Sequence, residues 1–172
     1  MKGRVLVVAG SDSGGGAGIQ ADIKTLTALG AYAATAVTAL TVQDTRGVRD
    51  VLPVPPAFVA AQMRAVLDDI GADAMKTGML ADAATIDAVC DALDAHGGRP
   101  ALVLDPVMVA KGGQALLAPA ALATLKRRLL PHAAVLTPNV PEAEVLSGST
   151  IADEAGLWRA AEALLTLGVP AV

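Results

Sequence analysis

A glycine-rich stretch near the N-terminus is the part of the sequence best suited to chemistry. Five glycines between Gly10 and Gly18 follow the apolar run Val5–Ala9 and precede a segment with helical periodicity. Continuous apolar runs of this length are typical of strands that are buried on both faces of a parallel sheet. Glycines let the backbone turn sharply and approach a ligand closely, and a helix that begins there directs free N–H groups at the turn. The stretch therefore predicts a strand, a ligand-binding turn and a helix.

One side chain in the predicted helix stands in an unusual place. The helix has an apolar stripe, formed by Ile19, Ile23, Leu26 and Leu29. At about 100° per residue, Asp22 lies within this stripe. The helix dipole explains an acidic residue near a helix N-terminus, because it favours negative charge there. The alternative is that Asp22 points into a partly buried pocket and hydrogen-bonds a substrate. Both explanations remain open.

Two nucleotide-binding motifs are excluded by their spacing. A Walker A loop requires glycine directly before its Lys-Ser/Thr pair, and neither Lys24 nor Lys76, each of which precedes a threonine, follows a glycine. The Gly14–Gly18 cluster departs from the G-x-G-x-x-G spacing, and no acidic residue closes the second predicted strand to bind a ribose. The glycine-rich turn is therefore neither of these two motifs.

The composition fits one globular domain over residues 1–172, because 53% of the residues are hydrophobic. One Trp, one Tyr and one Phe cannot form a stacking platform for single-stranded nucleic acid, and a net charge of −4 also disfavours nucleic acid as a partner. Apolar segments are shorter than a signal-peptide core or a membrane span. The single cysteine, Cys90, lies on an apolar helix stripe, which predicts a core residue in a reducing compartment. We therefore expect a cytoplasmic protein that binds neither nucleic acid nor membrane.

Strand-like and helix-like segments alternate along the chain. The predicted strands are Val5–Ala9, Ala33–Leu40, Val51–Val54, Asp73–Lys76, Ala101–Leu104 and Ala134–Leu136. Pro53 confines its strand to an edge, because proline cannot donate to a central ladder. Predicted helices begin after Pro55, at the capping residue Asp82, at Pro119 and at Asp153, and Trp158 in the last helix is expected to pack against the body. This alternation predicts an α/β fold with a mostly parallel sheet and helices on both faces.

Residues that could bind a ligand follow the predicted strands. They are Gly10, Gln43, Met79, Asp105 and Asn139. Because the carboxyl ends of parallel strands meet at one edge, where open α/β sheets bind ligands, we expect these residues to converge. The polar segment Thr41–Gly47 is predicted to be a loop, in which Gln43 offers both a donor and an acceptor to a heterocyclic edge. Asn139 taken alone would be a turn residue beside a proline.

Five segments resemble the hydroxymethylpyrimidine/phosphomethylpyrimidine kinases of thiamine biosynthesis, which belong to the ribokinase-like superfamily. The segments are Gly10–Thr25, Gln43–Val48, Lys76–Leu80, Asp105–Met108 and Thr137–Ala143. The resemblance runs through the whole chain in order. It implies a ribokinase-like fold, a homodimer, and ATP-dependent phosphorylation of hydroxymethylpyrimidine and its monophosphate with Mg²⁺. A pyridoxal kinase of the same superfamily, or a pyrimidine-binding module without catalysis, is the alternative.

The resemblance also implies roles for individual residues. The pyrimidine would lie near Gly10, Asp22, Gln43, Met79 and Val107. Asp22 and Gln43 would bind its polar edge. Asn139 and Glu142 match an N-x-x-E motif whose acid organises Mg²⁺ and the ATP phosphates, and Asp105 would be a second acid near the metal. The roles of Lys76 and Lys111 are left open, because lysines at strand ends are commonly solvated.

The resemblance further implies a C-terminally incomplete fold. Family members continue beyond a strand that begins like Val169–Val172, and a Gly-Thr-Gly-Cys segment with the anion hole and catalytic cysteine follows. That segment does not occur in the 172 residues, and Cys90 stands in a different context. From this we expect no catalytic residue within the chain, no kinase turnover by it alone, and a tendency to aggregate through an unpaired sheet edge.

Overall fold

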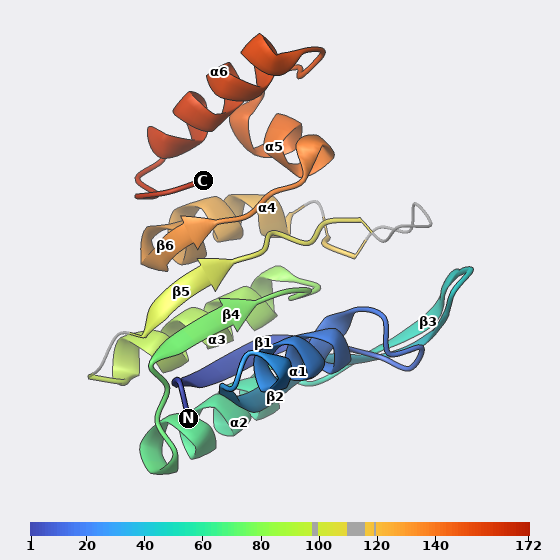
Figure 1. Cartoon of the computed structure of the whole chain (residues 1–172), viewed down its shortest axis with the longest axis vertical. Coiled ribbons are helices and arrows are strands. Elements are labelled where there is room, and N and C mark those ends of the chain that lie inside the picture. Colours follow the sequence, from blue (N-terminus) through green and yellow to red (C-terminus); the bar gives the residue numbers. More distant parts are fainter. Residues whose placement is uncertain (98–99, 110–115, 119) are drawn as a thin grey trace.

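A six-stranded sheet forms the centre of the molecule (Figure 1). The computed structural model describes residues 1–97, 100–109, 116–118 and 120–172. The strands are β1 (Arg4–Asp12), β2 (Tyr32–Asp44), β3 (Gly47–Pro53), β4 (Ala74–Thr77), β5 (Ala101–Leu104) and β6 (Ala133–Leu136). Their order across the sheet is β3-β2-β1-β4-β5-β6, and β3 alone pairs antiparallel with its neighbour in this sheet. The predicted mostly parallel sheet is therefore confirmed.

The register of the parallel strands aligns their carboxyl ends. Val8 of β1 pairs with Thr77 of β4, Thr77 pairs with Leu104 of β5, and Leu104 pairs with Leu136 of β6. The ladder extends one step further, since the N–H of Asp105 donates to the Thr77 carbonyl at 3.1 Å. The segments that leave β4, β5 and β6 therefore begin side by side, as the sequence predicts, and β1 continues past this row to Asp12.

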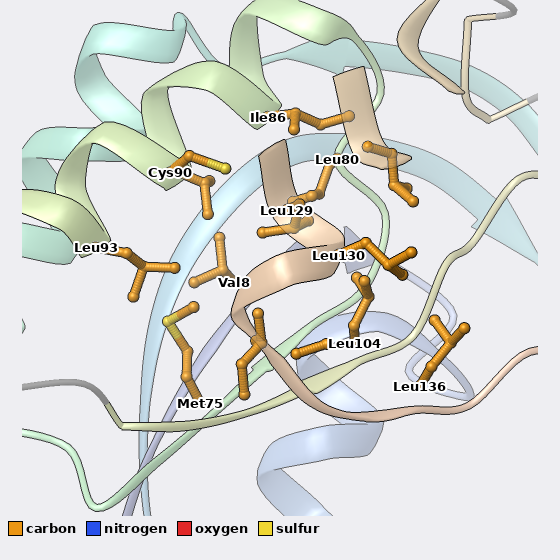
Figure 2. Packing of buried hydrophobic residues seen from close by; sticks show 14 of the residues in the cluster. Val8, Met75, Leu80, Ile86, Cys90, Leu93, Leu104, Leu129, Leu130 and Leu136 are labelled. Atoms are coloured by element: carbon orange, nitrogen blue, oxygen red, sulfur yellow. The ribbon is translucent and has the colours of Figure 1, made fainter. Parts of the chain in front are cut away.

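Helices lie on both faces of the sheet, and Figure 1 shows α1 in front of it and α3 behind it. The helices are α1 (Gly18–Ala28), α2 (Pro56–Asp69), α3 (Ala83–Ala95), α4 (Ala121–Thr124), α5 (Val140–Ser147) and α6 (Glu154–Leu165). The main core lies between the sheet and the α2, α3 and α4 layer. Figure 2 shows Val8, Met75 and Leu104 of the strands converging on Cys90 of α3 and on Leu129.

The helix α1 covers its face of the sheet only in part. The predicted stripe would bury Ile23 and Leu29, but these side chains are 37% and 60% exposed, and no residue of α1 is fully buried. The expectation of a buried stripe is therefore wrong. The reason is geometric, because α1 packs mainly on β1 and β2. A partly open helix face leaves room for polar side chains such as Asp22.

The predicted loop Thr41–Gly47 is instead the end of a β-hairpin. The strand β2 continues to Asp44 and pairs with β3, with Gln43 opposite Val48. The chain turns at residues 45–46. The edge position of Pro53 is confirmed, since it ends β3 at the outer strand of the sheet. The polar residues at the end of β2 favour a loop in the sequence, but a hairpin at the edge of a sheet has a solvent-facing side on which polar residues are common.

The C-terminal third confirms the helix predicted to begin at Asp153, which is α6 with Asp153 as its N-cap, but departs from the prediction elsewhere. The segment after α4 continues as a π-helical turn (Leu125–Leu129) and a 3₁₀ turn (Leu130–His132), and Pro119, the predicted helix start, is outside the described residues. The sequence did not predict α5. Trp158 is 64% exposed and does not pack against the body as expected, although its Nε1 lies 3.5 Å from Glu154 Oε1 one turn earlier.

The last residues run beside β6. Val169 is buried in the core, and the carbonyl of Ala171 accepts a hydrogen bond from the N–H of Leu136 at 2.9 Å. The segment Val169–Val172 has no strand assignment, although the sequence predicts a strand start there. No helix in the described part of the chain is long and apolar enough to cross a membrane.

The prediction that Cys90 is a core residue is confirmed. Its side chain is fully buried, and burial raises the pKa of the thiol from 9.0 to about 12. An ionised thiolate would have to lose its hydration, so the native state holds the proton more tightly than the unfolded chain does.

We therefore expect the free energy of unfolding to fall as the pH rises from 9 towards about 12. The unfolded thiol ionises in this range, whereas the native thiol stays protonated. Denaturant titrations of the wild type and Cys90→Ala should be compared at several pH values, since the variant keeps every other titrating group. A difference between the two that does not change with pH would contradict the prediction.

Candidate active site

A buried carboxylate holds the glycine-rich turn after β1. Asp12 is 4% exposed, and its Oδ1 accepts the N–H of Gly14 at 2.7 Å. Its Oδ2 accepts the N–H groups of Gly16 and Ala17 at 2.9 and 2.8 Å. The prediction that the turn offers free N–H groups to a ligand is therefore wrong for these three residues. The Asp12 carboxylate takes the place that a bound anion would have. The turn is therefore closed by its own side chain and does not bind a phosphate through these N–H groups.

Close backbone contacts explain two of the glycines. At Gly18, where φ is +56°, a Cβ atom would lie 2.4 Å from the carbonyl oxygen of Gly10. At Gly10, a Cβ atom would lie 2.6 Å from Cε of Met79. The contact at Gly18 is with backbone, so only glycine lets α1 begin against the end of β1, whereas a side chain at position 10 would require the tip of Met79 to move.

The β2–β3 hairpin is joined to the same turn through Gln43. The Oγ of Ser13 donates to the carbonyl of Gln43 and accepts its N–H, both at 2.8 Å. Thr41 Oγ1 donates to the carbonyl of Ser11 at 2.8 Å and lies 3.3 Å from Gln43 Oε1. These contacts hold Gln43 next to the glycine-rich turn, although its position in a strand was not expected.

Lys76 lies between two carboxylates that come from distant parts of the chain. Its Nζ is 3.1 Å from Oδ2 of Asp22 in α1 and 3.4 Å from Oδ2 of Asp105 after β5. All three side chains are partly buried, with exposed fractions of 24%, 23% and 32%. Asp22 therefore points towards the carboxyl edge of the sheet. The chain leaves β4 through Gly78, where an added Cβ atom would lie 3.0 Å from Cβ of Ala9 and 3.3 Å from Nζ of Lys76.

Asn139 and Glu142 form a capping box at the start of α5. Asn139 Oδ1 accepts the N–H of Glu142 at 3.0 Å, and Glu142 Oε2 accepts the N–H of Asn139 at 2.9 Å. Glu142 is 5% exposed, and its Oε1 lies 3.4 Å from the backbone nitrogen of Met108. The N-x-x-E spacing thus has a structural role, because it satisfies free N–H groups at the helix N-terminus.

Burial shifts the two acids proposed for the metal in the same direction. It raises the pKa of Asp105, and the positive charge of Lys76 opposes that rise. Burial also raises the pKa of Glu142, against the hydrogen bonds from Asn139 and Met108, and the charge of Asp105 adds to the increase. The two carboxylates therefore lie close enough to influence each other, and a cation near both would lower the cost of their ionisation.

The remaining predicted residues lie along the same edge. Met79 is 8% exposed, and its carbonyl accepts the hydroxyl of Thr38 at 2.6 Å. Val107 is half-buried, and its N–H donates to the carbonyl of Asp105 at 2.9 Å. Gly10 and Met79 are in contact, and Lys76 links Asp22 to Asp105. Lys111 is outside the described residues.

Comparison with known proteins gives these residues a family context. The family model for phosphomethylpyrimidine kinase matches residues 12–172. The chain belongs to this family.

Relatives and solved structures of the phosphomethylpyrimidine kinase family agree with the match. The chain is 55% identical, over 97% of its length, to the thiamine biosynthesis bifunctional protein ThiED of Geobacter sulfurreducens. It is 41% identical to the crystal structure of phosphomethylpyrimidine kinase from Clostridium difficile 630, with a TM-score of 0.88 over 96% of this chain and 71% of that one. A pyridoxal kinase from Staphylococcus aureus in complex with AMP-PCP and pyridoxal is 36% identical, with a TM-score of 0.83 over 96% of this chain and 59% of that one.

The chain spans only part of the curated relatives. It covers 34% of the Geobacter protein, and 60% of the hydroxymethylpyrimidine/phosphomethylpyrimidine kinase of Streptomyces coelicolor, to which it is 52% identical over 95% of its own length.

Two features of the candidate site are not among the predictions from the sequence. Asp12 was read only as part of the glycine-rich turn, although an aspartate two residues before a glycine is typical of a turn closed by its own side chain. The Asn139-to-Glu142 spacing was read only through the family motif, although it also fits a capping box before an apolar run. Both features depend on residues close together in the sequence, so the sequence alone could have predicted them.

We expect Asp12→Asn to destabilise the protein by about 1.5–3 kcal/mol, because an amide turns its NH₂ group towards at least one backbone N–H that the carboxylate now accepts. Denaturant unfolding would measure the loss. Asp82→Asn is the matched control, since Asp82 accepts one N–H, from Thr85, at the N-cap of α3, and asparagine caps a helix equally well. Equal effects of the two substitutions would contradict the role given to Asp12.

Proposed function

We propose that this chain contributes the pyrimidine-binding side of an enzyme that phosphorylates 4-amino-5-hydroxymethyl-2-methylpyrimidine and its monophosphate with ATP. The observation that carries the proposal is the position of Asp22, a partly buried carboxylate held at the carboxyl edge of the sheet in a chain of the phosphomethylpyrimidine kinase family. A carboxylate there can accept a hydrogen bond from an amino group on a heterocycle. Gln43 adds a donor and an acceptor from the other side of the glycine-rich turn.

The proposed pocket has an apolar and a polar part. Gly10, Met79 and Val107 supply close backbone approach and apolar surface, and Asp22 and Gln43 supply hydrogen bonds. This mixture suits a small heterocycle, because small-molecule sites are mostly apolar with a few oriented polar groups. Phosphoryl transfer depends mainly on positioning and charge neutralisation, so a site that fixes the substrate hydroxyl supplies part of the catalysis.

Mg²⁺ fits the acids at the phosphate end of the proposed site. Asp105 and Glu142 are oxygen donors, and Mg²⁺ in kinases is commonly bound by one or two carboxylates together with substrate phosphates. Within residues 1–97, 100–109, 116–118 and 120–172, no group of three or more His, Cys, Asp or Glu side chains could hold a metal ion by itself. A metal held by these two acids would neutralise negative charge on the ATP phosphates, near Asn139.

Pyridoxal is the second candidate substrate. The Staphylococcus aureus pyridoxal kinase in complex with AMP-PCP and pyridoxal superimposes on 96% of this chain. Pyridoxal and hydroxymethylpyrimidine are both aromatic nitrogen heterocycles with a hydroxymethyl group, so a pocket of this shape must discriminate by hydrogen bonds. The Geobacter and Streptomyces relatives, at 55% and 52% identity, favour the pyrimidine.

The family resemblance also supports a homodimer, and the single buried cysteine suits the reducing cytoplasm. Sedimentation equilibrium would measure the oligomeric state.

Calorimetric titration of the chain tests the pyrimidine site. We expect binding of hydroxymethylpyrimidine in preference to pyridoxal, and an affinity loss of about 10- to 150-fold (about 1.5–3 kcal/mol) in both Asp22→Asn and Gln43→Ala. Asp68→Ala, which removes an exposed carboxylate from α2, is the control and should bind like the wild type. Unchanged affinity in both site variants would place the pocket elsewhere, and a preference for pyridoxal would replace the substrate.

Glu142→Gln separates the capping role of Glu142 from its proposed metal role, because glutamine also forms a capping box but carries no charge. With AMP-PCP present, Mg²⁺ at about ten times its Kd should stabilise the wild type by about 1.4 kcal/mol. We expect Glu142→Gln to lose this increment. Without Mg²⁺ it should melt somewhat below the wild type, because its amide NH₂ group faces one of the two backbone N–H groups that Glu142 accepts.

Glu144→Gln is the control for that experiment. Glu144 lies in the same helix, but its Oε1 accepts the N–H of Ile151 at 2.7 Å. It should keep the Mg²⁺ increment. Retention of the full increment by Glu142→Gln would exclude Glu142 as a metal ligand.

A further inference from the structure

Lys76 is the ionic link between the pyrimidine end and the phosphate end of the proposed site. Its Nζ approaches one oxygen of Asp22 at 3.1 Å and one oxygen of Asp105 at 3.4 Å. The three residues come from α1, the end of β4 and the segment after β5, so the sequence separates them by 54 and 29 positions. Only the fold brings them together.

The two carboxylates repel each other without this ammonium. Both are partly buried, where water screens their charges less than at an open surface. The charge of Asp22 contributes to the raised pKa of Asp105, which places the two groups within electrostatic reach. Glu142 adds a third carboxylate within electrostatic reach of Asp105. The four side chains together carry three negative charges and one positive charge.

No other cation in the described ranges compensates these acids. Among those residues, Lys76 is the one Lys, Arg or His within 4.0 Å of a carboxylate oxygen of Asp22 or Asp105. Lys24, two residues after Asp22, donates to the carbonyl of Gly15 at 2.8 Å. The charge on Lys76 therefore has no substitute in this part of the chain.

We propose that Lys76 is a positioning residue that shields Asp22 from the charge of Asp105 and so keeps the Asp22 carboxylate oriented towards the pyrimidine. The inference rests on the proposed pyrimidine site. It assigns Lys76 an indirect role, in which the ammonium acts on the ligand through Asp22 and does not contact the ligand itself.

An indirect role makes the effect of Lys76 depend on Asp105. Removing the ammonium leaves Asp22 facing an uncompensated Asp105, and the repulsion turns Asp22 away from the pocket. Removing the charge of Asp105 as well abolishes that repulsion. If Lys76 bound the pyrimidine directly, or only supported the fold, its removal would lower the affinity by the same factor with Asp105 and with asparagine at position 105.

The test is a double-mutant cycle with Lys76→Met and Asp105→Asn, measured by calorimetric titration with hydroxymethylpyrimidine. We expect Lys76→Met to weaken binding about tenfold when Asp105 is present, and less than about threefold in the Asp105→Asn background. Lys76→Arg, which keeps the charge, should remain within about threefold of the wild type. Equal losses in the two backgrounds, no loss at all, or a Lys76→Arg variant as weak as Lys76→Met would each overturn the proposal.

Lys24→Met is the matched control, because it removes a positive charge from the same helix as Asp22 without touching either ion pair. The affinity change caused by Lys24→Met should be the same with Asp105 and with asparagine at position 105. If it depended on residue 105 as strongly as the change caused by Lys76→Met, the specific role of Lys76 would be overturned.

A ligand-free measurement separates this inference from the proposed function. The same cycle is read by thermal melting, where Lys76→Met should lower the Tm by about 2–4 °C more with Asp105 than with asparagine at that position. If the wild-type chain does not bind the pyrimidine, the proposed function fails, and the melting cycle decides whether Lys76 offsets the two charges. If the pyrimidine binds and neither cycle shows coupling, the inference about Lys76 fails alone. Lys76→Gln replaces Lys76→Met if the methionine variant does not fold.

Discussion

The parallel alignment of β1, β4, β5 and β6 is the constraint on which the candidate site depends. Each crossover returns the chain to the same end of the sheet, so every strand delivers its next residues to one edge. The pairing of Val8, Thr77, Leu104 and Leu136 in a single row fixes the height at which β4, β5 and β6 stop, and β1 continues beyond it to Asp12. A shift of one residue in β4 would turn Lys76 to the other face and remove it from both acids.

Collecting acids at this edge has an energetic cost that the surrounding residues offset in different ways. Three backbone N–H groups donate to the Asp12 carboxylate within the glycine-rich turn, and the ammonium of Lys76 forms ion pairs with Asp22 and Asp105. Glu142 relies on two backbone N–H groups. Both oxygens of Asp12 and of Glu142 therefore accept backbone N–H groups, whereas Asp22 and Asp105 each contact Lys76 through one oxygen only. Asp12 therefore shapes the site, whereas Asp22 and Asp105 can also bind a ligand.

The sequence predicts the parallel sheet and its functional edge because strand length, apolar runs and crossovers are local or nearly local properties. It also predicts Asp22 as unusual, since helical periodicity alone places that carboxylate on the apolar side. It could not predict the ion pairs of Lys76, which depend on the packing of α1 over β1 and on the register of β4 with β5. The hairpin was missed for a related reason, because pairing with β3 determines whether the polar residues of β2 are loop or strand.

The attachment of the β2–β3 hairpin to the glycine-rich turn has a mechanical consequence. Ser13 uses one hydroxyl to imitate both halves of a backbone ladder step, as donor and as acceptor to the same residue, Gln43. A single rotation about χ1 of Ser13 breaks both bonds together, and side chains as exposed as this one change rotamer within picoseconds to nanoseconds. The hairpin would stay attached to β1 after such a rotation, because Thr41 still donates to the Ser11 carbonyl and pairs with Asp12, so Ser13 controls the local position of Gln43 and not that of the whole hairpin.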